Sequence, residues 1–531
     1  MREEDVRTGS GHVVVVGGGI AGLAAAHRLL GRGLRVTVLE ASDRLGGKLL
    51  TGDIAGARVD LGAESMLARR PEAVTLARET GLGDRLQPPA TASASLWNRG
   101  VLRPMPKGHV MGVPGSALAL AGVLSAEGLR RVERDADLPR TEVGEDIAVG
   151  AYVAARLGRE VVDRLVEPLL GGVYAGDAYR LSLRLAVPQL YAAARTHTSL
   201  TEAVREIQAK AAAARQTGPV FMGIEGGVGR LPLAVAESVV ARGGEIRTGT
   251  PVTELRRTAP AGQASASATA TASTPASAST SASGERHGPG ASQRPGPASG
   301  EGPAPLWRIV AGGRVLHADA VVLAVPAPAA AALLRAEAPA AAAELAAVEY
   351  ASMALVTLAY RSADTTNLPE GSGFLVPPVD GHTIKASTFA SRKWGWIAGQ
   401  NPDLTVLRAS VGRYGETEVL GRPDADLVRV SRHDLREATG LDARPVETRV
   451  TRWDDGLPQY PVGHHARVAR VREHVGKLPG LAVCGAAYDG VGIPACIASA
   501  YAAVDGLGGD RDGLDALRAD PVRSPHGGAG E

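Results

Sequence analysis

Residues 11–22 read GHVVVVGGGIAG, and this stretch decides the fold. Its β-branched run predicts a buried strand, and the glycines after it open an apolar helical pattern that continues to Leu30. A second apolar run, 34–40, follows at once and ends on Glu40. Strand, glycine turn, helix and strand in this order form a βαβ unit, so we expect an α/β fold around a parallel sheet.

The spaced glycines of the turn suit a nucleotide site. Gly17 permits a tight turn, Gly19 lets the backbone approach a pyrophosphate, and Gly22 lets the helix pack close to the strand. The free N–H groups and partial positive charge at the helix N-terminus attract that pyrophosphate. Glu40 would accept hydrogen bonds from ribose hydroxyls, and its charge disfavours the 2′-phosphate of NADP. The pattern predicts a dinucleotide site, against the alternative of a purely structural turn.

A second glycine pair decides between NAD and FAD. Residues 41–48 read ASDRLGGK, so Gly46 and Gly47 stand between Arg44 and Lys48. Backbone donors and cations at this place would strengthen the binding of a diphosphate. NAD folds do not need this feature, whereas flavoproteins with two dinucleotide-binding domains carry it. The alternative is a basic surface turn, and we expect FAD.

The other end of the chain carries a third glycine-lined turn. Residues 481–484 predict a short strand, and GAAYDGVGIP at 485–494 leads into a helical run from Ala495 to Val504. Pro494 suits the first helical position, because its missing N–H is not needed there. A helix N-terminus aimed at the flavin would stabilise negative charge at its N1–C2=O edge. The alternative is a plain strand–helix turn.

Length and composition exclude several classes of protein. The chain has 531 residues, enough for two or three domains, of which 44% are apolar but only 3% aromatic. With 58 Lys and Arg against 56 Asp and Glu, the net charge of +2 argues against nucleic-acid binding. Two cysteines, Cys484 and Cys496, are too few for a disulfide framework or a four-ligand zinc site and suit a reducing cytoplasm. We expect no signal peptide, membrane span or metal site.

One long segment differs in composition from the rest. Residues 258–305 contain no Val, Ile, Leu, Met, Cys or aromatic residue and only four charged ones. Such a segment cannot bury enough apolar surface to offset its ordering entropy, so we expect a disordered insertion between two strands. Lengthening a loop this far costs only roughly 2 kcal/mol of closure entropy. The tail 509–531 is expected to be disordered as well.

Longer strings resemble the flavin-dependent porphyrinogen oxidases, a family related to monoamine oxidases and phytoene desaturases. The resemblance covers most of the chain outside the insertion and both ends. Two strings separate it from the amine oxidases, namely LVEPLLGGVYAGD at 165–177 and WDDGLPQY at 453–460. DLGAES at 60–65, EGGVGRLP at 225–232 and the stretch 485–496 also match the family's pattern.

The string PMPKGHVMGVP at 104–114 resembles the Gram-positive branch, whose members act on coproporphyrinogen III. The resemblance implies its oxidation to coproporphyrin III in haem biosynthesis, with six electrons passing through FAD to three O2 and giving three H2O2. Flavin N5 would accept each hydride, and no side chain is assigned as catalytic. Gly456 and Ala495 depart from the family pattern, which usually has Ala and often Asp there.

Three alternatives stay open at this point. A protoporphyrinogen IX oxidase would use the same chemistry, and only kinetics with both porphyrinogens would separate the two. An amine oxidase or carotenoid desaturase shares the scaffold, but amine oxidases usually enclose the amine in an aromatic cage, and aromatic residues are few here. A flavin-binding porphyrin carrier without turnover would release no peroxide.

The resemblance also implies contacts to substrate and cofactor. Arg70, with Arg69 beside it, would bind a substrate propionate, since a guanidinium matches a carboxylate at two points; the alternative is a solvated pair. Val252 would hold the adenine by its backbone, and Trp453 would contact the cofactor. The alternatives are that Val252 is an ordinary strand residue and that Trp453 is a core residue. The implied cofactor contacts are Gly17, Gly18, Gly19, Ile20, Ala21, Gly22, Glu40, Ala41, Lys48, Gly62, Ala63, Glu64, Ser65, Val252, Trp453, Val491, Gly492 and Ile493.

The family's architecture implies three domains. We expect a discontinuous FAD domain, a mixed-sheet substrate domain and a helical domain that could dock loosely on a membrane through residues near 111–124. Substrate and O2 are the expected partners, with a transient contact to ferrochelatase, in the cytoplasm or at the inner face of the cell membrane. The expected bounds are 11–68, 220–330 and 450–508 for the FAD domain, 186–219 and 331–449 for the substrate domain, and 69–185 for the helical domain.

Overall fold

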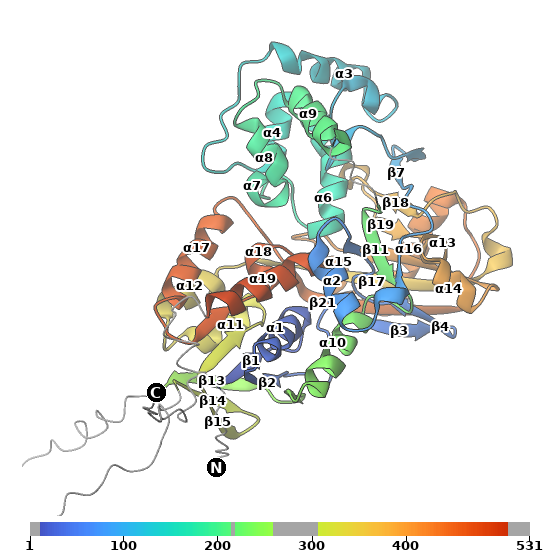
Figure 1. Cartoon of the computed structure of the whole chain (residues 1–531). Coiled ribbons are helices and arrows are strands. Elements are labelled where there is room, and N and C mark those ends of the chain that lie inside the picture. Colours follow the sequence, from blue (N-terminus) through green and yellow to red (C-terminus); the bar gives the residue numbers. More distant parts are fainter. Residues whose placement is uncertain (1–10, 214–217, 259–305, 508–531) are drawn as a thin grey trace, which may run out of the picture.

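Figure 1 shows the chain as a computed structural model, which describes residues 11–213, 218–258 and 306–507. The predicted insertion 258–305, apart from its first residue, and the predicted disordered tail 509–531 lie outside the described residues. Within the described ranges, no helix is long and apolar enough to cross a membrane.

A five-stranded parallel sheet carries the first glycine turn. β1 lies at its centre, and its valines pair in register with β2 on one side and β16 on the other. This confirms the predicted βαβ unit. Ligands of such sheets bind beyond the carboxyl ends of the strands, where the strand order reverses, and the glycine turn after β1 lies there. Across the sheet the strands are β12 (Glu245–Arg247), β2 (Arg35–Leu39), β1 (His12–Val16), β16 (Ala320–Leu323) and β22 (Leu481–Val483).

Helices cover both faces of this sheet (Figure 1). Alternate residues of β1 point to opposite faces, so Val13 and Val15 enter one apolar core while Val14 and Val16 enter another. Both cores are built mainly of Ala, Val and Leu, as the low aromatic content requires. One core holds α1 (Ile20–Gly31), α2 (Pro71–Glu79), α10 (Arg230–Ala241) and α19 (Ile493–Gly506), and the other α11 (Ala327–Leu334), α12 (Pro339–Ala346) and α17 (His464–Val475).

The strands after the insertion differ from the prediction. The sequence suggested two strands, 307–310 and 318–325, around Gly312 and Gly313. The structure has three, because both glycines adopt positive φ and close a tight hairpin between β14 and β15, after which β16 enters the parallel sheet. The strand before the insertion, β13, pairs with β14 as expected. The bounds are β13 (Val252–Arg257), β14 (Trp307–Ala311) and β15 (Arg314–Ala318).

A seven-stranded, mostly antiparallel sheet forms the second large layer. One of its faces packs on α16 (Asp424–Thr439) around Trp97, Phe374 and Tyr360. Two of its strands, β7 and β8, come from the range 69–185 that we predicted as helical, because Arg99 and Gly100 adopt positive φ and close a hairpin. In order the strands are β21 (Glu447–Pro458), β17 (Tyr350–Arg361), β20 (Leu404–Val411), β19 (Ile384–Thr388), β18 (Gly373–Leu375), β7 (Ser95–Asn98) and β8 (Val101–Pro104).

The helical layer lies at the top of Figure 1 and has its own apolar core. The segment 186–213 packs there, since Leu190, Leu200 and Val204 are buried in this core; this differs from the predicted bounds, which placed 186–219 with the substrate domain. The helices are α3 (Ala126–Glu133), α4 (Val149–Leu157), α5 (Arg159–Val161), α6 (Glu167–Tyr174), α7 (Leu183–Ala186), α8 (Pro188–Ala194) and α9 (Leu200–Ala213).

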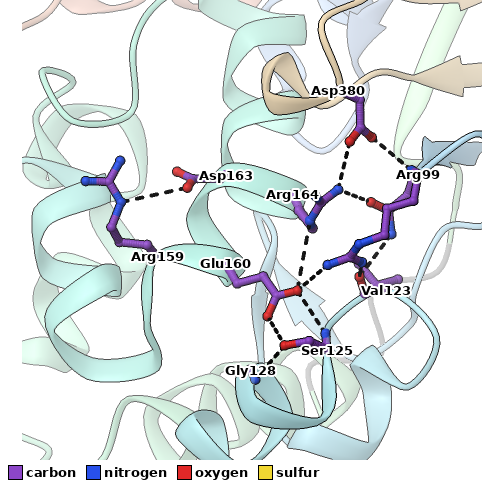
Figure 2. A network of polar contacts seen from close by, with 10 residues as sticks. Arg99, Val123, Ser125, Gly128, Arg159, Glu160, Asp163, Arg164 and Asp380 are labelled. Atoms are coloured by element: carbon purple, nitrogen blue, oxygen red, sulfur yellow. Dashed lines mark hydrogen bonds and ion pairs between the residues drawn. The ribbon is translucent and has the colours of Figure 1, made fainter.

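Figure 2 shows a polar network that ties this layer to the seven-stranded sheet. Arg164 lies in a π-helical turn, 162–166, and its Nη1 is 3.0 Å from Asp380 Oδ1 in the loop after β18. Glu160 pairs with Arg99 at the β7–β8 turn and accepts a hydrogen bond from the Ser125 hydroxyl. The network therefore fixes the start of α6, which follows the π-helical turn directly. Such turns occur frequently at functional sites.

Candidate cofactor and substrate site

The first two glycine turns lie against each other. The Gly46 N–H donates to the Gly18 carbonyl oxygen at 2.9 Å, and Gly19 and Gly46 form an isolated bridge. A Cβ built on Gly47 would lie 3.5 Å from the Gly19 Cα atom. Residues 17–22 and 41–48 therefore form one backbone surface.

At two glycines of the first turn, a side chain of any size would clash with the backbone. Gly17 has a φ of +110°, and a Cβ on it would lie 2.5 Å from the Ala324 carbonyl oxygen. A Cβ on Gly22 would lie 1.9 Å from the Gly17 carbonyl oxygen. Gly19, in contrast, would have no atom within 4 Å of its Cβ, so the backbone of the turn faces open space. That space fits the close approach of a pyrophosphate to the helix N-terminus.

The Glu40 carboxylate is fixed at the end of β2. It accepts hydrogen bonds from the Gly18 N–H at 2.6 Å and from the Ser42 N–H at 2.9 Å. The Thr250 N–H donates to the Glu40 carbonyl oxygen at 2.8 Å, so the chain that leads into Val252 passes beside it. Glu40 and the start of β13 thus adjoin the glycine turn, where a ribose and adenine would lie.

Lys48, Gly62 and Trp453 meet at a third place. A Cβ on Gly62 would lie 2.1 Å from the Lys48 carbonyl oxygen and 3.1 Å from the Trp453 ring. The Trp453 indole N–H donates to the Leu61 carbonyl oxygen at 3.0 Å. The predicted turn 62–65 therefore packs against the second glycine turn and the indole of β21.

The Lys48 ammonium supplies a partly buried cation at this place. It donates no hydrogen bond within the described part of the chain, and burial lowers its pKa. Its charge acts on the Cys496 thiol in the first turns of α19, and Gly492, at the start of that helix, gives it no side-chain cap. A cation beside an uncapped helix N-terminus suits an anionic group. These residues fit the diphosphate or the flavin of an FAD molecule.

The Glu64 side chain has a structural role, and the cofactor contact that the resemblance implied for this residue stays a prediction. Its side chain is enclosed and pairs with Lys393 and Arg408, which belong to the seven-stranded sheet and its neighbouring helix. Burial opposes ionisation, but the two cations outweigh it and lower the pKa of Glu64 to about 2. Arg408 also donates to the Gly62 carbonyl oxygen at 2.6 Å. Sequence reasoning missed both cations, because nothing in the local pattern places them beside residue 64.

The structure separates Arg69 from Arg70. Arg70 precedes α2, lies 2.9 Å from Glu72, and its charge reaches Cys496 on the cofactor side. Arg69 instead lines a surface cavity of about 380 Å³ together with Arg78 and Met222. The two arginines therefore have different surroundings, and Arg70 acts on the side where the cofactor turns lie.

The strings 165–177 and 453–460 come together beside the C-terminal turn. The Tyr174 and Tyr460 rings pack edge to face with centroids 5.9 Å apart, and the Tyr460 hydroxyl donates to the Ala486 carbonyl oxygen. Val173 is 46% exposed, and a Cβ on Gly171 would meet no atom within 4 Å. α6 is therefore only partly covered around Gly171 and Val173, and we call this stretch the open part of α6.

The family model described as flavin-containing amine oxidoreductase matches residues 20–280 and 300–507. The coproporphyrinogen III oxidase of Mycobacterium tuberculosis strain H37Rv is 37% identical over 96% of this chain and 98% of its own length. The coproporphyrinogen III oxidase of Bacillus subtilis is 31% identical over 93% and 97%. Human protoporphyrinogen oxidase is 29% identical over 93% and 98%.

Solved structures show the same fold. A protein from Exiguobacterium assigned as a protoporphyrinogen oxidase matches with a TM-score of 0.75 and 32% identity, covering 94% of this chain and 98% of its own. Cyclohexylamine oxidase from Brevibacterium oxydans matches with a TM-score of 0.62 and 17% identity, covering 94% and 99%. The second match supports the fold alone.

Proposed function

Because the chain belongs to the flavin-containing amine oxidoreductases, we propose that it oxidises coproporphyrinogen III to coproporphyrin III with O2 as oxidant. The mixed α/β fold and the flavin cofactor predicted from the sequence are confirmed by the family match and the solved structures. Curated relatives over nearly the full chain carry the name coproporphyrinogen III oxidase, which supports this substrate. Protoporphyrinogen IX is the second candidate, since the human relative is a protoporphyrinogen oxidase.

One observation carries the proposal. Backbone turns at 17–22, 46–48 and 491–493 converge, although the third lies at the other end of the described chain, and a partly buried Lys48 lies where they meet. The open part of α6 leads into Tyr174, which packs on Tyr460 beside the third turn. This arrangement suits a dinucleotide whose isoalloxazine faces a large apolar substrate.

The chain's own residues would hold and orient the two reactants. When bound, the flavin supplies a two-electron acceptor that O2 can reoxidise. Lys48 and the N-terminus of α19 would stabilise negative charge at the flavin edge, and the apolar surface of α6 would exclude water. Arg70 would bind a propionate and orient the macrocycle. We assign no general base, because aromatisation itself provides the driving force.

Anaerobic mixing of the FAD-loaded protein with coproporphyrinogen III tests the proposal. With at least three equivalents of the FAD-loaded protein per porphyrinogen, three flavins should bleach for each porphyrin that forms, because each flavin accepts two of the six electrons. Admission of air should then release three H2O2 per porphyrin formed. Kinetics with protoporphyrinogen IX, measured side by side, decide between the two substrates. A protein that takes up no FAD, or that binds porphyrinogen without bleaching, would contradict the proposal.

Two contacts predicted from the resemblance extend the proposal. A transient contact with ferrochelatase would pass the porphyrin on, and docking at a membrane surface would bring it near other lipid-bound enzymes. In the segment 111–124, Val113, Leu120, Val123 and Leu124 are buried, but Leu118 is 83% exposed. Co-sedimentation with anionic vesicles, compared between wild type and Leu118→Ser, tests the membrane contact.

A further inference from the structure

A buried lysine without a hydrogen-bond partner lies at the other side of α6. Lys385 is 4% exposed, and in the described residues its ammonium donates no hydrogen bond. It stands at a bulge of β19, where the register with β20 shifts between Ile384 and Ala386. Bulges re-aim side chains and are frequent beside active sites. An ammonium offers three donors, and leaving them unused inside a protein is costly.

A second cation lies close to this lysine. Arg413, 9% exposed, follows β20, and its guanidinium donates weakly to the carbonyl oxygens of Val376 and Ile384 at 3.4 and 3.5 Å. Glu416 is its nearest anion, at 3.5 Å. Burial and the neighbouring Arg413 lower the pKa of Lys385 to about 7, although Glu416 opposes them. Two cations therefore share one loosely held carboxylate.

This pair of cations lies near both ends of α6. Arg413 acts electrostatically on Glu167, the first residue of α6, and the Tyr414 N–H donates to the Ala175 carbonyl oxygen at 2.6 Å, just after its end. A Cβ on Gly172 would lie 3.6 Å from the Leu375 side chain in β18, the strand beside β19. Figure 1 shows α6 descending from the helical layer toward these strands.

The carboxylate that already belongs to this region does not neutralise the pair. Glu167 is partly buried, and this desolvation raises its pKa to about 7; its Oε2 accepts the Ala178 N–H at 2.7 Å. Its charge is therefore only partly present near neutral pH. Asp163 and Asp177 also act on Glu167 and raise its pKa. An anionic ligand group beside α6 would pair with the Arg413 guanidinium and would favour the protonated form of Lys385, whose pKa of about 7 leaves it only partly charged near neutral pH.

We propose that Lys385 and Arg413 bind a propionate of the substrate at the edge of the macrocycle away from Arg70, and that Lys385 favours a tetracarboxylate porphyrinogen over a dicarboxylate one. The inference rests on the proposed function. Coproporphyrinogen III carries four propionates, whereas protoporphyrinogen IX carries two and has vinyl groups in place of the others. An additional carboxylate would give the buried cation a hydrogen-bond acceptor and a counter-charge, whereas a vinyl group offers neither.

The test compares Lys385→Met, which keeps the side-chain length but removes the charge, with Lys385→Arg. Lys477→Met serves as the control, because Lys477 is exposed and pairs only with Glu473 on the surface. The KM and kcat for both porphyrinogens are measured, together with the Kd for the products coproporphyrin III and protoporphyrin IX by fluorescence. Flavin absorbance and thermal unfolding show that each variant is folded and loaded.

We expect Lys385→Met to raise the KM and the product Kd about tenfold for the tetracarboxylate, with kcat and the dicarboxylate values changed less than about twofold. Lys385→Arg should restore most of the affinity. Equal changes for both porphyrins, or no change for either, would overturn the inference while wild-type turnover still supports the proposed function. If Lys385→Met does not fold, Lys385→Gln gives the same comparison. A wild-type protein that oxidises neither porphyrinogen would overturn the proposed function itself.

Discussion

Lys393 Nζ lies 2.5 Å from Glu64 Oε1, although 329 residues separate the two in the sequence. Arg408 pairs with the second oxygen of the same carboxylate and also donates to Gly62 O. The turn 62–65, which packs on the cofactor side, is thus held by two cations from the layer of the seven-stranded sheet. The position of the cofactor turn and the position of this sheet are coupled through one enclosed carboxylate.

Arg408→Met should loosen this coupling. It removes one cation from the enclosed Glu64 and the donor to Gly62, so we expect unfolding free energy to fall by roughly 3 kcal/mol and FAD affinity to fall with it. Urea unfolding of the apo-protein and FAD titration by flavin fluorescence measure the two effects. Arg429→Met is the matched control, because Arg429 is 70% exposed and pairs with Asp426 at the surface. A loss of stability with unchanged FAD affinity would show that the ion pairs of Glu64 do not position the turn 62–65.

His464 should make the stability depend on pH. Its Nε2 lies 2.9 Å from the Ala487 carbonyl oxygen, Nδ1 has no partner in the described residues, and burial lowers the pKa of the ring to about 4. Because the folded pKa lies below the unfolded one, the stabilisation is complete above about pH 6.5 and is lost as the pH falls toward 4.

From pH 7.5 to pH 5, this linkage predicts a loss of about 2 kcal/mol in unfolding free energy. His464→Gln keeps a donor for Ala487 but cannot titrate, so it should remove most of that loss. His433→Gln, at an exposed position of α16, should leave the pH dependence as in wild type. Denaturant unfolding at both pH values checks the three proteins, and identical slopes for wild type and His464→Gln would contradict the assignment.

The parts of the site that depend on local backbone conformation could be predicted from the sequence. The glycine turn after β1, the second turn at Gly46 and the start of α19 each have a spacing that one conformation explains, and the structure brings them together. The ion pairs of Glu64 with Lys393 and Arg408 could not be predicted, because no local sequence pattern indicates which carboxylate the two cations contact. The same limit applies to Lys385, whose burial depends on how α6 and β19 pack.

Two predictions from the sequence were wrong about where one element ends and which layer a segment joins. Residues 307–325 read as two strands, whereas the glycines 312 and 313 close a hairpin that frees β16 for the parallel sheet. Segment 186–213 has an apolar spacing that could serve either layer, and tertiary contacts alone place it in the helical core. Periodicity identifies an apolar face but does not say which partner covers it.

Arg70→Met should weaken substrate binding more than turnover. The Arg70 guanidinium pairs with Glu72 in the structure. If it also binds a propionate equally well in the ground and transition states, its removal should raise KM about tenfold while kcat changes less than about twofold. Arg69→Met should change KM little, because Arg69 faces the separate surface cavity. Steady-state kinetics with coproporphyrinogen III compare the two. A large loss of kcat at constant KM would give Arg70 a role in the reaction itself.

Gly22→Ala should abolish FAD binding. The added Cβ would lie 1.9 Å from the Gly17 carbonyl oxygen, so either the helix or the turn must move, and we expect a destabilisation of about 3 kcal/mol or more. Gly31→Ala, at the other end of the same helix, is the control: nothing lies within 4 Å of the added Cβ, and alanine is the better helix former, so stability should stay equal or rise by up to about 1 kcal/mol. The flavin content after reconstitution and the midpoint of urea unfolding are the measurements. A Gly22→Ala protein that retains FAD with normal affinity would show that the turn tolerates the displacement, and the close packing of α1 on β1 would then not be what holds the dinucleotide.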